Sequence, residues 1–140
     1  MEEWESIWIG IQMLIKNNYK YSINDLKERA LILSDRIRSP CSVLLNGTLG
    51  KGKTTFSKFF IENILLDKSV KVTSPTFNII QIYETTKGEL WHIDLYRVKN
   101  ECEIFELGIL ESMTENICLI EWPGLLKKYI KRYNYIEFDL

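Results

Sequence analysis

The sequence predicts an α/β fold, a three-layer sandwich in which a mixed, mostly parallel sheet lies between helices. Three observations support this prediction. A glycine-rich loop at residues 47–54 stands between a short apolar run and a helix-like segment. Residues 117–120 are continuously apolar, which is typical of a parallel strand buried on both faces. Residues 77–83 and 89–95 are rich in β-branched and aromatic side chains and are joined by a polar segment, which predicts one antiparallel hairpin.

Length and composition favour a single domain. The chain has 140 residues, and 46% of them are hydrophobic, which is enough for one buried core but too little for two ordinary domains. We expect that domain at residues 21–140. The 18 basic and 19 acidic residues nearly cancel, so the composition gives no basic footprint for nucleic acid or an anionic membrane. Any RNA contact would have to be local or come through a partner.

Two helices are predicted before the glycine-rich loop. At residues 1–20, apolar side chains recur at helical spacing and indicate an appended amphipathic helix. This helix would dock on its own domain or, alternatively, contact a partner. A second helix is predicted from Asn24, a cap residue, to a stop before Pro40. A short strand at residues 42–46 then leads into the loop.

Residues 47–54 read G-x-x-x-x-G-K-T, the pattern of a phosphate-binding loop, or P-loop. Glycines let backbone N–H groups turn inward around a phosphate, the lysine cancels charge on terminal phosphates, and the threonine hydroxyl can bind Mg²⁺. The alternative is a glycine-rich turn without a ligand, but the flanking strand and helix favour a P-loop NTPase-like fold that binds a nucleoside triphosphate. The predicted nucleotide-binding residues of this segment are Gly47, Leu49, Gly50, Lys51, Gly52, Lys53, Thr54 and Thr55.

The remainder of the chain supplies the other layers. An apolar face that begins at Phe56 predicts a helix whose N-terminus points at the phosphates. The turn-like residues 73–76 precede the hairpin. Further predicted elements are the hairpin connection at 84–88, a helix at 101–113 with a break at Gly108, a strand at 117–120, a short helix through 125–126 and a final strand near 135–140.

Two acidic residues are candidates for metal binding and catalysis. Glu121 comes at the end of a predicted strand, where such folds place an acidic residue that holds Mg²⁺ directly or through water. An ordinary strand-end carboxylate is the alternative. Asp94 lies in an otherwise apolar strand, on a face that it would share with His92 and Tyr96. An aspartate there needs a partner or a metal, and Arg97 could be an ion-pair partner instead.

Thr76 is a further candidate, because a threonine between a helix and a strand can reach the γ-phosphate or its metal. His92 is the only histidine of the chain, so no histidine-rich metal site can form. We expect His92 to be structural.

Other features point to a reducing compartment. The three cysteines are widely spaced and form no C-x-x-C pair, which argues against a disulfide framework and a zinc site. The first residues are acidic and no apolar run approaches the length of a membrane span. We therefore expect a cytoplasmic protein without a membrane partner.

Four segments occur together in order: LNGTLGKGKTTF at 45–56, TSPTF at 73–77, HIDLYR at 92–97 and IEWP at 120–123. Together they resemble the TsaE (YjeE) family of small bacterial ATPases in tRNA threonylcarbamoyladenosine biosynthesis. The resemblance covers residues 21–140. It implies an ATPase that uses ATP and Mg²⁺, acts with the TsaD and TsaB proteins, and meets tRNA indirectly through that complex.

The resemblance also implies roles for single residues. Lys53 would contact the terminal phosphates, Thr54 and Glu121 would hold Mg²⁺, and Asp94 would serve catalysis near the metal. Thr76 would belong to a switch-like loop, and Trp122 would border the nucleotide. The family's loop usually reads G-D-L-G-A-G-K-T, whereas this chain has Thr48 in place of the aspartate and Lys51 in place of the alanine. The family usually has a glutamate after I-E-W-P, where this chain has Gly124.

Three other functions are alternatives to an ATPase. A P-loop small-molecule kinase usually has an arginine-rich lid, whereas few arginines follow the loop helix here. A GTPase would need a guanine-reading N-K-x-D motif, which the sequence lacks. A nucleotide-binding assembly module with little hydrolysis is the alternative from another class.

Overall fold

The computed structural model describes residues 22–47 and 52–140. The predicted helix at residues 1–20 lies outside the described residues. The predicted nucleotide-binding residues Leu49, Gly50 and Lys51 lie outside them as well.

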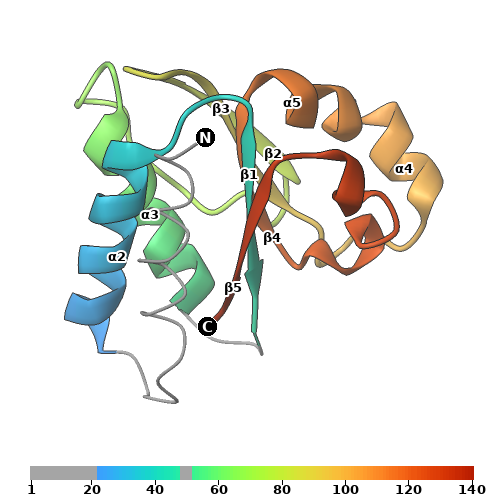
Figure 1. Cartoon of the computed structure of the whole chain (residues 1–140), viewed down its shortest axis with the longest axis horizontal. Coiled ribbons are helices and arrows are strands. Elements are labelled where there is room, and N and C mark those ends of the chain that lie inside the picture. Colours follow the sequence, from blue (N-terminus) through green and yellow to red (C-terminus); the bar gives the residue numbers. More distant parts are fainter. Residues whose placement is uncertain (1–21, 48–51) are drawn as a thin grey trace.

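The described residues form a five-stranded sheet with helices on both faces, which confirms the predicted α/β class. Figure 1 shows α2 and α3 on one face and α4 and α5 on the other, so the fold has three layers. The elements are α2 (Ile23–Arg36), β1 (Cys41–Asn46), α3 (Gly52–Ile64), β2 (Ile80–Thr85), β3 (Gly88–Asp94), α4 (Glu101–Glu106), α5 (Ile109–Glu115), β4 (Ile117–Glu121), the 3-10 turns η1 (Pro123–Leu126) and η2 (Ile130–Arg132), and β5 (Tyr135–Asp139).

The strand order is β2-β3-β4-β1-β5, in which only the β2–β3 pair is antiparallel. Strands β3, β4 and β1 are parallel neighbours, so their carboxyl ends meet at one edge of the sheet. In this register Glu121 of β4 lies between Asp94 of β3 and Leu45 of β1. Residues that are far apart in the sequence are therefore neighbours at the edge of the sheet where β1 ends.

Two predicted boundaries are wrong. Helix α2 is capped by Ser22 instead of Asn24, because the Ser22 side chain and Asp25 form a reciprocal capping box. Strand β2 begins at Ile80 instead of residue 77. The three residues before it form a loop that ends at Ile79, whose φ of 67° is unusual for a β-branched residue.

The hairpin connection is also tighter than predicted. The sequence predicts it at residues 84–88, but Thr85 and Gly88 are paired and only the two residues between them turn the chain. Thr85 fixes this turn, because its hydroxyl donates to the carbonyl of Gly88 at 2.6 Å and accepts from the N–H of Lys87 at 3.1 Å. Gly88 has a φ of 103°, which favours glycine.

The break predicted at Gly108 is confirmed. Gly108 has a left-handed φ of 73° and separates α4 from α5. No helix among the described residues is long and apolar enough to cross a membrane.

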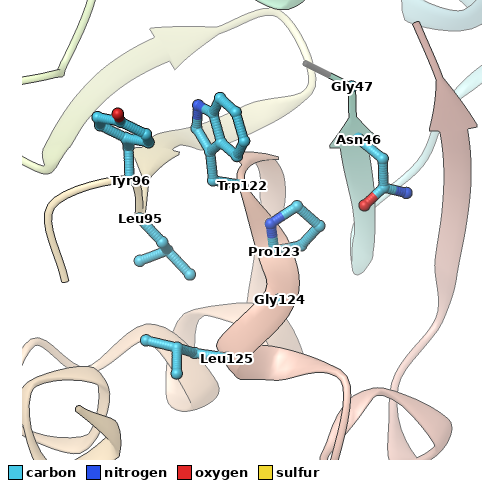
Figure 2. Close-up of a pocket in the computed structure, with 8 residues that line it drawn as sticks. All are labelled: Asn46, Gly47, Leu95, Tyr96, Trp122, Pro123, Gly124 and Leu125. Atoms are coloured by element: carbon cyan, nitrogen blue, oxygen red, sulfur yellow. The ribbon is translucent and has the colours of Figure 1, made fainter. Parts of the chain in front are cut away.

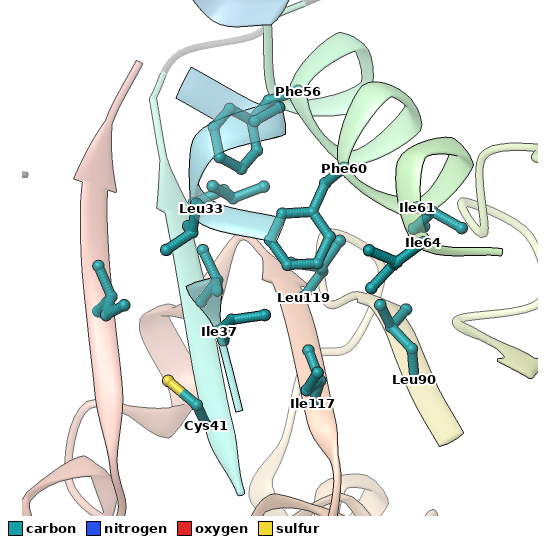
Figure 3. Packing of buried hydrophobic residues seen from close by; sticks show 14 of the residues in the cluster. Leu33, Ile37, Cys41, Phe56, Phe60, Ile61, Ile64, Leu90, Ile117 and Leu119 are labelled. Carbon is teal, nitrogen blue, oxygen red and sulfur yellow. The ribbon is translucent and has the colours of Figure 1, made fainter. Parts of the chain in front are cut away.

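The largest buried side chains lie between α3 and the sheet. Phe56 and Phe60 of α3 are fully buried there with Leu33 and Ile37 of the α2 side (Figure 3). The Phe56 and Phe60 ring centroids are 6.3 Å apart. This cluster fixes α3, and with it the N-terminal turn of α3 that begins at Gly52.

Replacing Phe60 by alanine is expected to lower the free energy of unfolding by about 3–5 kcal/mol, because a buried ring leaves a cavity. Chemical denaturation of the wild type and the variant measures this difference. Phe77 is 78% exposed, so Phe77→Ala is the matched control and is expected to cost less than about 1 kcal/mol. Equal losses in the two variants would contradict the described packing.

Candidate active site

The site is built where β3 and β4 end beneath the first turn of α3. Asp94 and Glu121 are register partners on neighbouring strands, and both are buried, with 5% and 2% of their surface exposed. Thr54, in the first turn of α3, donates from its hydroxyl to Oε1 of Glu121 at 3.3 Å. The structure thus brings together the predicted metal residues Thr54 and Glu121 with the predicted catalytic residue Asp94.

Asp94 is held by the loops at its end of the sheet. Its Oδ1 accepts from the backbone N–H of Tyr96 at 3.0 Å, and its Oδ2 accepts from the hydroxyl of Thr76 at 3.3 Å. The predicted residue Thr76 is therefore at the site. The backbone N–H of Asp94 donates to the carbonyl of Ile79 at 2.8 Å, which ties the loop before β2 to the same point.

Two details of the Asp94 prediction are wrong. Tyr96 does not share a strand face with it, because β3 ends at Asp94 and Tyr96 lies in the following turn. Arg97 forms no ion pair with Asp94 in the described part of the chain; its guanidinium carbon lies 4.3 Å from the centre of the Phe77 ring. Asp94 is therefore held by a hydroxyl group and a backbone N–H group, and not by an arginine side chain.

Lys53 packs against the tryptophan that follows β4. The Lys53 side chain is buried, and its Nζ lies 4.3 Å from the centre of the Trp122 ring. Trp122 has a left-handed φ of 57°, which turns the chain sharply after Glu121. Its ring centroid lies 5.0 Å from that of Tyr96. The structure thus brings together Lys53 and Trp122, two of the predicted nucleotide-binding residues.

These side chains surround two adjoining cavities. The first has a volume of about 190 Å³ and is lined by Lys53, Thr54, Thr76, Asp94, Tyr96, Glu121 and Trp122. The second, about 470 Å³, is lined by Asn46, Gly47, Leu95, Tyr96, Trp122, Pro123, Gly124 and Leu125 (Figure 2). Tyr96 and Trp122 border both. The first cavity is polar and charged, and the second is largely aromatic and apolar.

Gly47 and Gly52 are the described glycines of the predicted phosphate-binding loop. Gly47 has a φ of 147°, and a Cβ atom there would come within 2.4 Å of the carbonyl oxygen of Leu140, so a larger residue does not fit. Gly52 begins α3, and Thr55 lies half-buried in its first turn. Gly52 and Thr55 therefore lie at the start of α3, where free N–H groups favour anions, and Gly47 directly follows β1.

The donor set fits magnesium better than zinc. Among residues 22–47 and 52–140, no group of three histidine, cysteine or acidic side chains could hold a metal alone. Mg²⁺ typically takes only one or two carboxylates and completes its shell with phosphate oxygens and water. The Thr54 hydroxyl and the Glu121 carboxylate, with Asp94 beside them, offer oxygen atoms of this kind.

His92 belongs to the site, although the sequence alone predicts only a structural role for it. Its Nε2 lies 2.7 Å from Oε2 of Glu121, and the ring is 1% exposed. In the sequence, the only indication that His92 belongs to the site is its position two residues before Asp94, which puts both side chains on one strand face. A lone histidine in an apolar strand gives no indication of its partner.

Two of the three cysteines, Cys41 and Cys118, are buried. All three cysteines are free. Desolvation raises the pKa of Cys41 to about 12 and that of Cys118 to about 11, so both remain thiols at neutral pH.

Comparison with known proteins shows the family to which the chain belongs. Residues 20–140 match the family described as "Threonylcarbamoyl adenosine biosynthesis protein TsaE". The chain belongs to the TsaE family. Its relatives named "tRNA threonylcarbamoyladenosine biosynthesis protein TsaE" include one from Rickettsia prowazekii, 40% identical over 110 aligned positions, with 76% of this chain and 76% of the relative covered. Another from Bacillus subtilis is 37% identical over 112 residues, 78% of this chain and 68% of the relative.

A solved structure has a fold similar to that of this chain. The crystal structure of YdiB from Bacillus subtilis matches with a TM-score of 0.57 and 27% identity, over 86% of this chain and 73% of that one. The family match and the relatives confirm the TsaE resemblance seen in the four sequence segments, and the solved structure confirms the P-loop-like fold.

Proposed function

We propose that this TsaE-family chain binds and hydrolyses ATP with Mg²⁺. The observation that carries the proposal is the convergence of Lys53, Thr54, Asp94 and Glu121 on one small cavity at the start of α3. A cation, a hydroxyl and two carboxylates are the groups that phosphoryl transfer from a metal-bound nucleotide requires. The family and the relatives' names support a role in threonylcarbamoyladenosine biosynthesis.

In this proposal each residue has a separate task. Lys53 leaves the Trp122 ring and neutralises charge on the terminal phosphates, which also meet the N–H groups at the start of α3. Thr54 and Glu121 hold Mg²⁺, which when bound offsets the charge that develops on the phosphoryl oxygens. Asp94 accepts a hydrogen bond from the attacking water, and Thr76 keeps that carboxylate in place.

We further propose that the chain acts with TsaD and TsaB and meets tRNA only through them. The chain's near-zero net charge supports this arrangement, because direct tRNA binding depends on an excess of basic residues. Phosphate release by the purified chain, with and without these two proteins, tests the partner role. A partner-dependent increase is expected. Absence of hydrolysis in both cases, with ATP still bound, would favour an assembly module instead.

Replacing Glu121 by glutamine tests the metal role. We expect the dissociation constant for Mg-ATP to rise about 10- to 100-fold, because a charged ligand is lost, while binding of ATP in excess chelator changes little. Isothermal titration with and without Mg²⁺ measures both quantities. Glu62→Gln, an exposed carboxylate on α3, is the control. Equal losses with and without Mg²⁺ would contradict the role.

A further inference from the structure

We propose that His92 is a positioning residue that orients the carboxylate of Glu121 for metal binding. Its Nε2–H donates to Oε2 of Glu121, which leaves Oε1 directed at Thr54 and the cavity. The inference rests on the proposed function, because it assigns His92 a task within that metal site.

His92 cannot act on the nucleotide itself. The ring is 1% exposed, and the side chains that line the 190 Å³ cavity include Glu121 but not His92. Its Nε2 atom already forms a hydrogen bond with Oε2 of Glu121 at 2.7 Å. Any effect of His92 on ATP must therefore pass through Glu121.

The surroundings of the ring decide which nitrogen carries the hydrogen. Nδ1 is buried and has no hydrogen-bond partner in the part of the chain that the structure describes. With the hydrogen on Nδ1, a buried donor would be unpaired, and the Nε2 lone pair would face a carboxylate oxygen at 2.7 Å. With the hydrogen on Nε2, the ring donates to the carboxylate. The geometry therefore assigns the Nε2–H tautomer to His92.

This hydrogen bond divides the two oxygens of Glu121 between two tasks. Oε2 is fixed to the neighbouring strand, and Oε1 lies 3.3 Å from the Thr54 hydroxyl. Without the His92 donor, the carboxylate would be free to rotate and would lose its fixed geometry toward the cation. Loss of such a supporting contact typically weakens metal binding by about 10- to 100-fold.

Two amide variants separate this role from simple packing. In His92→Gln the amide nitrogen can take the place of Nε2 and donate to Glu121, whereas in His92→Asn the side chain is too short to reach it. We expect His92→Asn to raise the dissociation constant for Mg-ATP by about tenfold or more, and His92→Gln to stay within about threefold of the wild type. Binding of ATP in excess chelator is expected to change less than about twofold in both, because phosphate contacts remain.

Both variants are compared after thermal unfolding has shown them to be folded. Equal losses with and without Mg²⁺, or equal losses in the two variants, would overturn the proposal. A second measurement needs no variant: nitrogen-15 NMR of the wild type, prepared without a histidine tag, reports the tautomer of its single histidine. A hydrogen on Nε2 is expected, and one on Nδ1 would overturn the assignment.

These outcomes separate the inference from the proposed function. If the wild type does not bind ATP, the proposed function fails and the positioning role fails with it. If the wild type binds Mg-ATP and Glu121→Gln weakens it, but His92→Asn does not, the function stands and only the inference about His92 is wrong.

Discussion

Replacing Lys53 by alanine is expected to lower the rate of ATP hydrolysis by about 100- to 1000-fold, the loss typical when one group that stabilises transition-state charge is removed. The lysine is buried beside Thr54 and Glu121, so solvent would screen its charge from the phosphates only weakly. Affinity for ATP should fall as well, because the same charge meets the ground-state phosphates. Phosphate release under single-turnover conditions and titration with ATP measure the two effects.

Lys58 provides the matched control for this experiment. It lies on the same helix α3 but is exposed, and it forms an i,i+4 pair with Glu62 at 4.0 Å. Lys58→Ala should leave hydrolysis within about twofold of the wild type, because exposed pairs of this kind contribute little. Undiminished hydrolysis in Lys53→Ala would show that the nucleotide binds elsewhere, and the whole site assignment would then be wrong.

The sequence is informative about the site wherever a residue's role depends on its position along one element. Glu121 ends a strand that is buried along its whole length, and Asp94 ends the neighbouring strand of the sheet. Carboxyl ends of parallel strands meet at one edge, so the sequence was enough to place Glu121 there, whereas Asp94 was predicted within a strand and only the TsaE resemblance placed it near the metal. The strand before and the helix after the glycine-rich pattern at 47–54 were predictable for the same reason, because the pattern normally lies between these two elements.

Contacts that depend on strand register could not be predicted. His92 and Glu121 are 29 positions apart and meet only because β3 and β4 pair in this register. A shift of one residue would have turned the histidine to the opposite face. The contact between Lys53 and Trp122 likewise depends on the left-handed backbone of Trp122, which a bulky residue rarely adopts.

The loop before β2 shows a second limit of the sequence. Its apolar residues continue the pattern of the strand and therefore predict a strand that begins at residue 77. In the structure the hydroxyl of Thr76 and the carbonyl of Ile79 both bond to Asp94, and these contacts hold the chain in a loop. Tertiary hydrogen bonds thus override the local preference for a strand, at a point where the loop serves the site.

Replacing Asp94 by asparagine is expected to lower turnover by about 100-fold or more, because an amide can neither take up a proton nor supply negative charge beside the metal. The variant should retain the shape of the site. An amide oxygen still accepts from the N–H of Tyr96, and the amide nitrogen can donate to the Thr76 hydroxyl. Affinity for Mg-ATP should therefore stay within about threefold of the wild type.

This separation of turnover from affinity is what distinguishes a catalytic Asp94 from a structural one. Asp139, an exposed aspartate at the end of β5, is the matched control, and Asp139→Asn should change neither quantity. If Asp94→Asn loses affinity as strongly as turnover, the carboxylate binds the metal-nucleotide or holds the loop instead. Thr76→Ala then separates those two cases, because it removes one loop contact to Asp94 and leaves the carboxylate in place.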